Sequence, residues 1–167
     1  MAEIITVKNF RDHTTALSDG TAVTPLDYTL NIVPGSFKYD DPGHDEILIR
    51  DQGEIAGTRK GNANPITGSY QAYFRQFTDG SEDALIDFIK AGGNLAAMVT
   101  TGTNAFKDFV HVDLVHTVEG TDFGDSADHV ATFSDCVQKY GYDISGEIAV
   151  IDVTFTCYGG AAFTGPA

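Results

Sequence analysis

Apolar and polar side chains alternate with a period of two through much of the sequence, which predicts β-strands with one buried face. Residues 66–77 show the pattern most clearly, because one side of the predicted strand is apolar and the other is mostly polar. The first side holds Ile66, Tyr70, Ala72 and Phe74, and the second holds Ser69, Gln71, Tyr73 and Arg75. We expect the first side to face the core.

Similar patterns occur along the rest of the chain. The segments EIITVKNF (residues 3–10) and TAVTPLDYTLNIVPGSFKYD (21–40) have strand composition, although Pro25 and Pro34 favour an edge or a bend. Further strands are predicted in FKDFVHVDLVHTVEG (106–120), VATFSDC (130–136) and GEIAVIDVTFTCYG (146–159). The chain is therefore expected to be mainly β.

One helix is predicted, in DGSEDALIDFIKAGGN (residues 79–94). Ser81 is a suitable N-cap, and the acids after it favour the positive end of the helix dipole. The apolar stripe of the helix consists of Leu85, Ile86, Phe88 and Ile89. Its C-terminal end is marked by Lys90, Gly92 and Gly93. One short helix against many strands predicts a β-sandwich or barrel, with the helix covering one open end or face.

The connection between Lys38 and Pro65 is unusually long. Structureless loops above about 12–15 residues are uncommon in compact domains and are usually functional or mobile. The connection can form a short strand pair, EILIRD with EIAGT, that turns at Gln52-Gly53, and we expect RKGNAN (residues 59–64) to form its tip. This tip has nothing apolar to bury against its own domain, so we predict a long protruding loop.

The net charge of the 167-residue chain is −14, from 24 Asp plus Glu against 10 Lys plus Arg. Such a surface repels phosphates, which argues against a protein that grips DNA but not against one past which DNA slides. Residues 108–152 carry many acids and a single basic residue, Lys139, whereas Arg50, Arg59 and Lys60 gather in the long connection. This separation suits head-to-tail contact between copies, and acidity that serves solubility alone is the alternative.

The length predicts one domain over residues 1–167. No window approaches the roughly 20 apolar residues of a membrane span, and MAEIITVKNF lacks the pattern of a secretion signal. We therefore expect the chain to stay in the cytosol where it is made. In that reducing compartment Cys136 and Cys157 are expected to be free, partly buried thiols, since a disulfide would require them to meet across neighbouring strands.

No pattern for catalysis, a cofactor or a metal stands out. HVDLVH places His111 and Asp113 on one strand face and His116 on the other, so the three cannot ligate one ion. We expect the cluster HDE (44–46) to be a solvated acidic turn and TDFGDSADH (121–129) an acidic hairpin loop, in preference to cation sites. GTRKGN lacks the Ser or Thr and the helix of a phosphate-binding loop.

With its segments in this order, the chain resembles the major tail tube proteins of long-tailed bacteriophages. The resemblance covers most of residues 33–159, through VPGSFKYDDPGHDEILIRDQGEIAGTRKGNANPITGSYQAYFRQFTDGS, EDALIDFIKAGG and HVATFSDCVQKYGYDISGEIAVIDVTFTCYG. The family pattern D-x-G-x-x-x-G-x-R-x-G followed by P, and the later F-x-D-C step, are matched by Asp51, Gly53, Gly57, Arg59, Gly61 and Pro65, and by Phe133, Asp135 and Cys136.

The resemblance implies a tail-tube-like β-sandwich subunit whose hexameric rings stack into a tube around a channel, through which double-stranded DNA passes without tight binding. It implies a place in the virion tail, assembly in the host cytoplasm, contacts with other tail proteins and no enzymatic activity. Asp113 and Asp152 are candidates to line the channel, with the outer surface as the alternative location. The long loop would contact a neighbouring copy through Arg50, Asp51, Gly53, Glu54, Arg59, Lys60 and Asn62.

Three other functions are open. An adhesive or carbohydrate-binding β-sandwich would present flat aromatic side chains, yet the chain has no Trp, and its 7 Tyr and 11 Phe fall mostly at strand positions that we expect in the core. Another virion protein, such as a tail completion or decoration protein, could share parts of the pattern. A metal-dependent enzyme is the third alternative.

Overall fold

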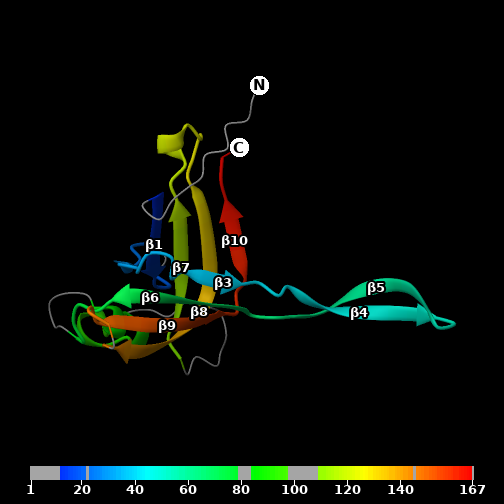
Figure 1. Ribbon diagram of the computed structural model, residues 1–167, viewed down its shortest axis with the longest axis horizontal. Coiled ribbons are helices and arrows are strands. Elements are labelled where there is room, and N and C mark those ends of the chain that lie inside the picture. The colour runs from blue at the N-terminus through cyan, green and yellow to red at the C-terminus, as the bar shows by residue number, and fades with distance from the viewer. Residues whose placement is uncertain (1–11, 22, 79–83, 98–108, 145, 167) are drawn as a thin grey trace.

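The fold is taken from a computed structural model, which describes residues 12–21, 23–78, 84–97, 109–144 and 146–166. An eight-stranded antiparallel sheet follows the order β2-β1-β7-β8-β9-β6-β3, and β10 pairs with β8 beside this path, while β4 and β5 form a separate hairpin (Figure 1). The strands are β1 His13–Ser18, β2 Asp27–Thr29, β3 Lys38–Asp40, β4 His44–Asp51, β5 Glu54–Ala63, β6 Ile66–Tyr73, β7 His111–Val118, β8 His129–Asp143, β9 Val150–Cys157 and β10 Ala161–Thr164.

The strand path has two ends, at β2 and β3, so the sheet does not close into a barrel over the described residues. The long strand β8 gives the sheet two directions, since it pairs with β10 over residues 130–133 and with β9 over residues 136–143. Between them Asp135 has a φ of 59°, and the pairing with β7 shifts between Val112 and Leu114. Such a bulge bends a strand, and Figure 1 shows β1, β7 and β10 running across the direction of β6 and β9.

The core confirms the faces predicted from alternation. On β6, Ile66, Tyr70 and Ala72 are buried, although the strand ends at Tyr73 and not at Phe77. On β9 every second side chain is buried, from Ile151 to Cys157. The expectation of a mainly β fold with one short helix and a long protruding segment is confirmed.

The predicted helical stripe also lies in the core. Helix α1 spans Leu85–Lys90 and buries all four apolar residues of the stripe, and the ring of Phe88 lies 6.2 Å from that of Tyr28 on β2. Ser81 lies outside the described residues; the helix begins after Ala84, which provides no side-chain cap. At the other end the left-handed capping residue is Ala91, one position before the predicted Gly92. Two short 3₁₀ helices follow at Gly93–Leu95 and Thr121–Phe123.

The prediction of free thiols is wrong. Cys136 on β8 and Cys157 on β9 lie directly opposite each other in register and form a disulfide, with 4.0 Å between their Cα atoms. Both side chains are fully buried. The bond depends on the register between these two consecutive strands, which the sequence pattern alone does not reveal.

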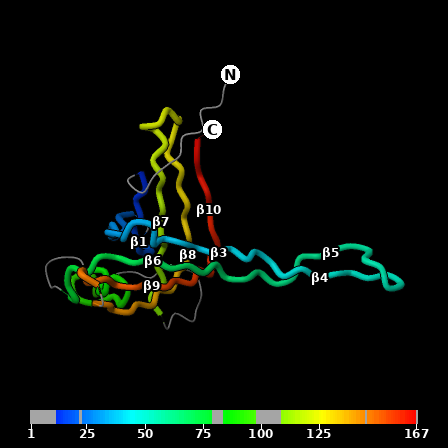
Figure 2. The backbone as a smooth tube through the Cα atoms, in the orientation of Figure 1, coloured from blue at the N-terminus to red at the C-terminus, as the bar shows by residue number. Residues whose placement is uncertain are grey.

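The long connection forms a hairpin, here called the arm, which consists of β4, β5 and their turn (residues 44–63). Figures 1 and 2 show the arm extending away from the body as a two-stranded ribbon. The predicted strand pair and its turn at Gln52-Gly53 are confirmed, but RKGNAN is not the tip. Strand pairing continues from this turn back to Ala63 opposite His44, so residues 59–64 lie at the body end of the arm.

Candidate functional site

The tip of the arm is a tight two-residue turn. Gln52 and Gly53 both have positive φ, 48° and 89°, and they connect the paired residues Asp51 and Glu54. Two successive positive φ values are typical of the type I′ turn, whose twist matches that of a β-hairpin. Gly53 adopts this conformation without steric cost, so the D-x-G spacing noted in the sequence has a structural role at the tip.

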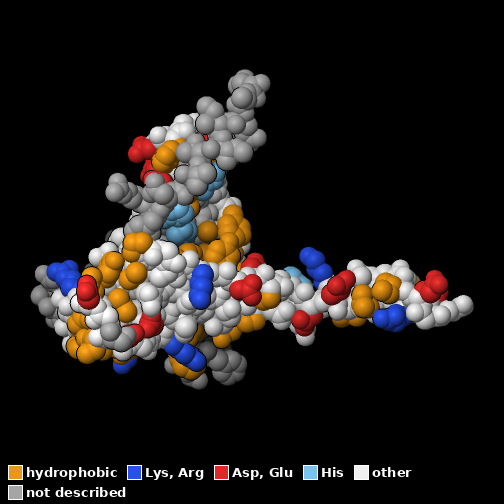
Figure 3. All heavy atoms as spheres, viewed as in Figure 1, with side chains coloured by type: hydrophobic (Ala, Val, Ile, Leu, Met, Phe, Trp, Pro, Cys, Tyr) orange, Lys and Arg blue, Asp and Glu red, His pale blue; other side chains and the backbone are white. Residues whose placement is uncertain are grey.

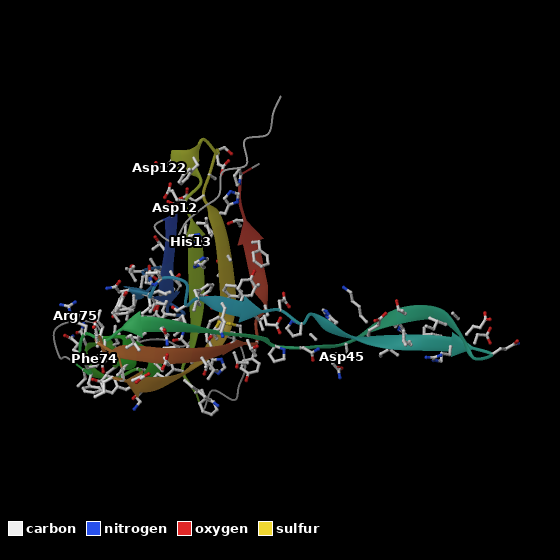
Figure 4. The ribbon with its side chains drawn as sticks, in the orientation of Figure 1. Asp12, His13, Asp45, Phe74, Arg75 and Asp122 are labelled. Atoms are coloured by element: carbon white, nitrogen blue, oxygen red, sulfur yellow. A yellow bond between two sulfur atoms is a disulfide. The ribbon has the colours of Figure 1, made fainter. Side chains whose placement is uncertain are left out.

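The base of the arm is held by Asn64 and Asp45. The Asn64 side-chain amide donates a hydrogen bond to the Asp45 carboxylate at 2.9 Å, and its backbone N–H donates to the Gly43 carbonyl at 2.8 Å. Asp45 is labelled in Figure 4 where the arm leaves the body. Gly61 is packed closely here, because an added Cβ would lie 3.0 Å from the Asp45 Cβ. These hydrogen bonds and this close packing hold the two strands of the arm together at its base.

The arm has two faces, which the strand register defines because cross-strand partners point to the same side. A register shift between Ile49 and Arg50 leaves Ala56 as an extra residue on β5, so Ile55 lies opposite Arg50. The Ile47 face consists of Ile47, Ile49, Asp51, Glu54, Gly57 and Arg59. The Leu48 face consists of Glu46, Leu48, Arg50, Ile55, Thr58 and Lys60.

All seven predicted contact residues are exposed on the arm. Asp51, Gly53 and Glu54 lie at its tip, and Asn62 lies near its base. The three basic residues do not form one group, however. Arg50 and Lys60 lie on the Leu48 face, whereas Arg59 lies on the Ile47 face, because the alternation of a strand separates neighbouring side chains.

The apolar side chains of the arm were not among the contact residues predicted from the sequence. Ile47, Leu48, Ile49 and Ile55 are 52%, 46%, 45% and 59% exposed, and Figure 3 shows apolar side chains on the arm, far from the body. Single exposed apolar residues are ordinary, but four together on a thin ribbon indicate a contact surface. The available signal was the run of three apolar residues, 47–49, between charged neighbours.

A second apolar surface lies at the end of the body opposite the arm. Phe74, labelled in Figure 4, has ring centroid distances of 4.7 Å to Phe77 and 4.8 Å to Tyr142. Phe77 and Tyr142 are both about half exposed, and Ile144 and Ile148, near Tyr142 in the sequence, are more exposed. The molecule thus carries exposed apolar side chains at both ends of its longest axis.

Asp152 lies on the polar face of the sheet. It stands between the buried residues Ile151 and Val153 on β9, so it points away from the core, and the Gln71 side-chain amide donates a hydrogen bond to it at 2.6 Å. Thr154 and Thr156 continue this face along β9. The result is a hydroxyl- and amide-rich surface with a half-buried carboxylate.

Asp113 has a local structural role at the bulge of β8. Its carboxylate accepts a hydrogen bond from the Asp135 backbone N–H at 3.0 Å, and the Asp135 carboxylate in turn pairs with Nδ1 of the buried His111. His116 belongs to a different group, as the alternation predicted. These contacts stabilise the left-handed Asp135 and hence the bend of β8.

His116 lies at a cavity of about 520 Å³ beside β1 and β2. Thr15 Oγ1 and His13 Nδ1 lie 2.7 and 3.0 Å from the two nitrogens of its ring, and the Phe37 ring stacks on it at 4.4 Å. Figure 4 labels His13 on this side of the body. Burial, and secondarily the nearby His13, lower the pKa of His116 to about 4, so this imidazole is neutral at pH 7.

The two acidic clusters lie on different elements. Within the described residues, no group of three or more His, Cys, Asp or Glu side chains is placed to hold a metal ion. The HDE cluster lies on β4 and not in a turn. The acidic hairpin loop is confirmed between β7 and β8, where Asp128 accepts hydrogen bonds from the backbone N–H groups of Gly120 and Thr121, which lower the pKa of its carboxyl.

None of the helices in the described part of the chain has the length and apolar character needed to span a membrane. No protein-family model and no curated protein matches this sequence. Solved structures, in contrast, share its fold over nearly the whole length.

A chain from the PVC sheath/tube terminator of an extracellular contractile injection system has a TM-score of 0.61 at 12% identity, covering 97% of this chain and 99% of that chain. A chain from the anti-feeding prophage (AFP) tube terminating cap has a TM-score of 0.63 at 12% identity, covering 99% and 95%. For the PVC sheath-tube complex the values are 0.57 at 14%, covering 96% and 91%. This chain therefore shares the fold of these components of contractile injection systems.

Proposed function

We propose that this protein is a structural subunit of a phage-tail-like tube, which joins identical copies into hexameric rings that stack around a channel. The arm carries the proposal, since its four apolar side chains are about half exposed on a hairpin that extends away from its own body. The shared fold with chains of the PVC sheath-tube complex and the AFP cap supports the same assignment. In this function the protein resides in the tail and contacts other tail proteins.

The apolar surfaces at opposite ends of the molecule support a head-to-tail contact. A contact between two different surfaces of identical subunits leaves one surface free on each terminal subunit, so the assembly either closes into a ring or continues as a helix. A dimer with a two-fold axis would instead use one surface twice. The separation of the arm from the Phe74 cluster therefore favours rings and stacked rings.

The charge and the polar sheet face support a conduit. Duplex DNA carries about one negative charge per 1.7 Å, so an acidic wall would let it pass without tight binding. We assign the face of Asp152, Thr154 and Thr156 to the channel. Asp113 is a weaker candidate for the lining than Asp152, because its carboxylate is already engaged at the bulge.

A tube-terminating subunit is the second candidate function. The observation that favours it is the match over 97–99% of this chain to chains of a PVC terminator and an AFP cap. A terminator would form a single ring that does not stack on itself, whereas a tube subunit would polymerise. The two functions therefore differ in the length of the assembly.

Negative-stain electron microscopy and sedimentation velocity of the purified protein test the proposal. Tubes with a central channel are expected for a tube subunit, and isolated rings for a terminator. A monomer at all salt and protein concentrations would contradict both. Thermal shift with glycans would then test the adhesive β-sandwich, and elemental analysis for stoichiometric metal would test the enzyme alternative.

A further inference from the structure

We infer that the arm is enclosed on both of its faces by other copies of this chain, so that each arm is a buried layer between neighbours and not a strap lying on one surface. This inference rests on the proposed self-assembly and adds to it. A two-stranded antiparallel hairpin commonly buries one face and leaves the other in water. The arm departs from that pattern.

Each face carries two exposed aliphatic side chains. Ile47 and Ile49 lie on one face, and Leu48 and Ile55 lie on the other. The bulge at Ala56 matters here, because it brings Ile55 onto the face of Leu48 and so gives both faces the same number of apolar residues. A surface that covered only one face would leave the other pair in water.

The hairpin also lacks internal support. It is a separate two-stranded sheet, and an isolated two-stranded hairpin is at best marginally stable in water. Layers on both sides would bury its apolar side chains. They would also protect the exposed edges of the hairpin from non-specific pairing with other chains, which leads to aggregation.

On the Leu48 face, charge complementarity supports a second copy of this chain as the occupant. The Leu48 face carries Arg50 and Lys60 against Glu46, a net charge of +1. Residues 44–63 hold three basic and four acidic residues, a net of −1, so the rest of the chain carries −14 + 1 = −13. A strongly acidic body on a neighbouring copy therefore suits this face.

Single introduced thiols test the inference directly. The only two cysteines form a buried disulfide, so Ile47→Cys and Leu48→Cys each add one reactive thiol to an otherwise unreactive chain. The two variants are a matched pair, being adjacent on β4, similarly exposed and on opposite faces. Maleimide labelling is measured on the dissociated subunit and on the assembled ring or tube.

Both thiols should react rapidly in the subunit, and both should be protected at least tenfold in the assembly. Protection of one thiol alone, or of neither, would overturn the inference. As a second measurement, Ile47→Ser/Ile49→Ser and Leu48→Ser/Ile55→Ser should each raise the critical concentration for assembly roughly tenfold or more. Normal assembly by either double variant would also overturn it.

These outcomes separate the inference from the function on which it rests. If the wild-type protein forms neither rings nor tubes, the proposed function fails and the inference falls with it. If the wild-type protein assembles while one arm face stays reactive, only the inference fails.

Discussion

Reduction of the Cys136–Cys157 disulfide should lower the free energy of unfolding by about 3 kcal/mol. The two cysteines are 21 residues apart in sequence, and the loop-closure entropy that a cross-link removes from an unfolded chain grows slowly with that separation. For a loop of this size the entropy model gives roughly 3 kcal/mol at 25 °C. Both sulfur atoms are buried, so the reduced thiols remain packed and little cavity cost is added.

Urea unfolding of oxidised and fully reduced protein at pH 7 measures this difference. With a slope of about 2 kcal/mol per molar urea, the midpoint should fall by about 1.5 M on reduction. The matched control is Cys136→Ala/Cys157→Ala, whose midpoint should not respond to the reductant. Thiol titration in denaturant, without reductant, should find no free thiol in the oxidised protein.

Two results would refute this reasoning. Two free thiols in protein purified without reductant would mean that the bond does not form. Equal midpoints for oxidised and reduced protein, with the bond verified in the first, would mean that the cross-link does not restrict the unfolded chain as the entropy model requires. Either result would return Cys136 and Cys157 to the role of small buried apolar residues.

Three further predictions concern the arm, the histidine pair and the sheet. Arg59→Glu/Lys60→Glu changes one charge on each face of the arm and should block polymerisation while circular dichroism stays native; wild-type-like tubes would mean that the arm is not a contact. The pKa of His116 lies near 4 in the folded protein and near 6.5 in the unfolded chain, so its contribution to the free energy of unfolding should be complete above pH 6.5 and decline as the pH falls toward 4. NMR titration of His116 together with denaturation at several pH values checks this. A flat profile would contradict it. Gly68→Ala would place a Cβ 2.2 Å from the Phe155 ring, so thermal unfolding should show a loss of about 1–3 kcal/mol, and an unchanged melting temperature would be inconsistent with this packing.

The elements that the sequence predicted well are those in which local pattern and tertiary burial agree. The buried side of β6 follows directly from the alternation around Tyr70, and the helical stripe around Phe88 lies in the core as expected. The turn at Gln52-Gly53 was predictable because few residues adopt positive φ without strain.

The features that the sequence did not predict depend on register. Cys136 meets Cys157 only because β8 and β9 align at that pair, and no local pattern encodes the alignment. The bulge at Ala56 likewise decides which face of the arm carries Ile55. Arg59 and Lys60, in contrast, are adjacent on one strand, so alternation alone separates them; the register of the hairpin decides only which apolar residues share a face with each.

The attachment of the arm has a mechanical consequence. Only Asn64 and Pro65 separate β5 from β6, so the part of a pull that β5 transmits would enter the body at Ile66. Ile66 is paired with Cys157, which is bonded covalently to Cys136 on the next strand. A pull from a neighbouring molecule would thus act directly on three connected strands, β6, β9 and β8. It would have to break the hydrogen bonds between β6 and β9 together, by shear, and not one at a time, by peeling.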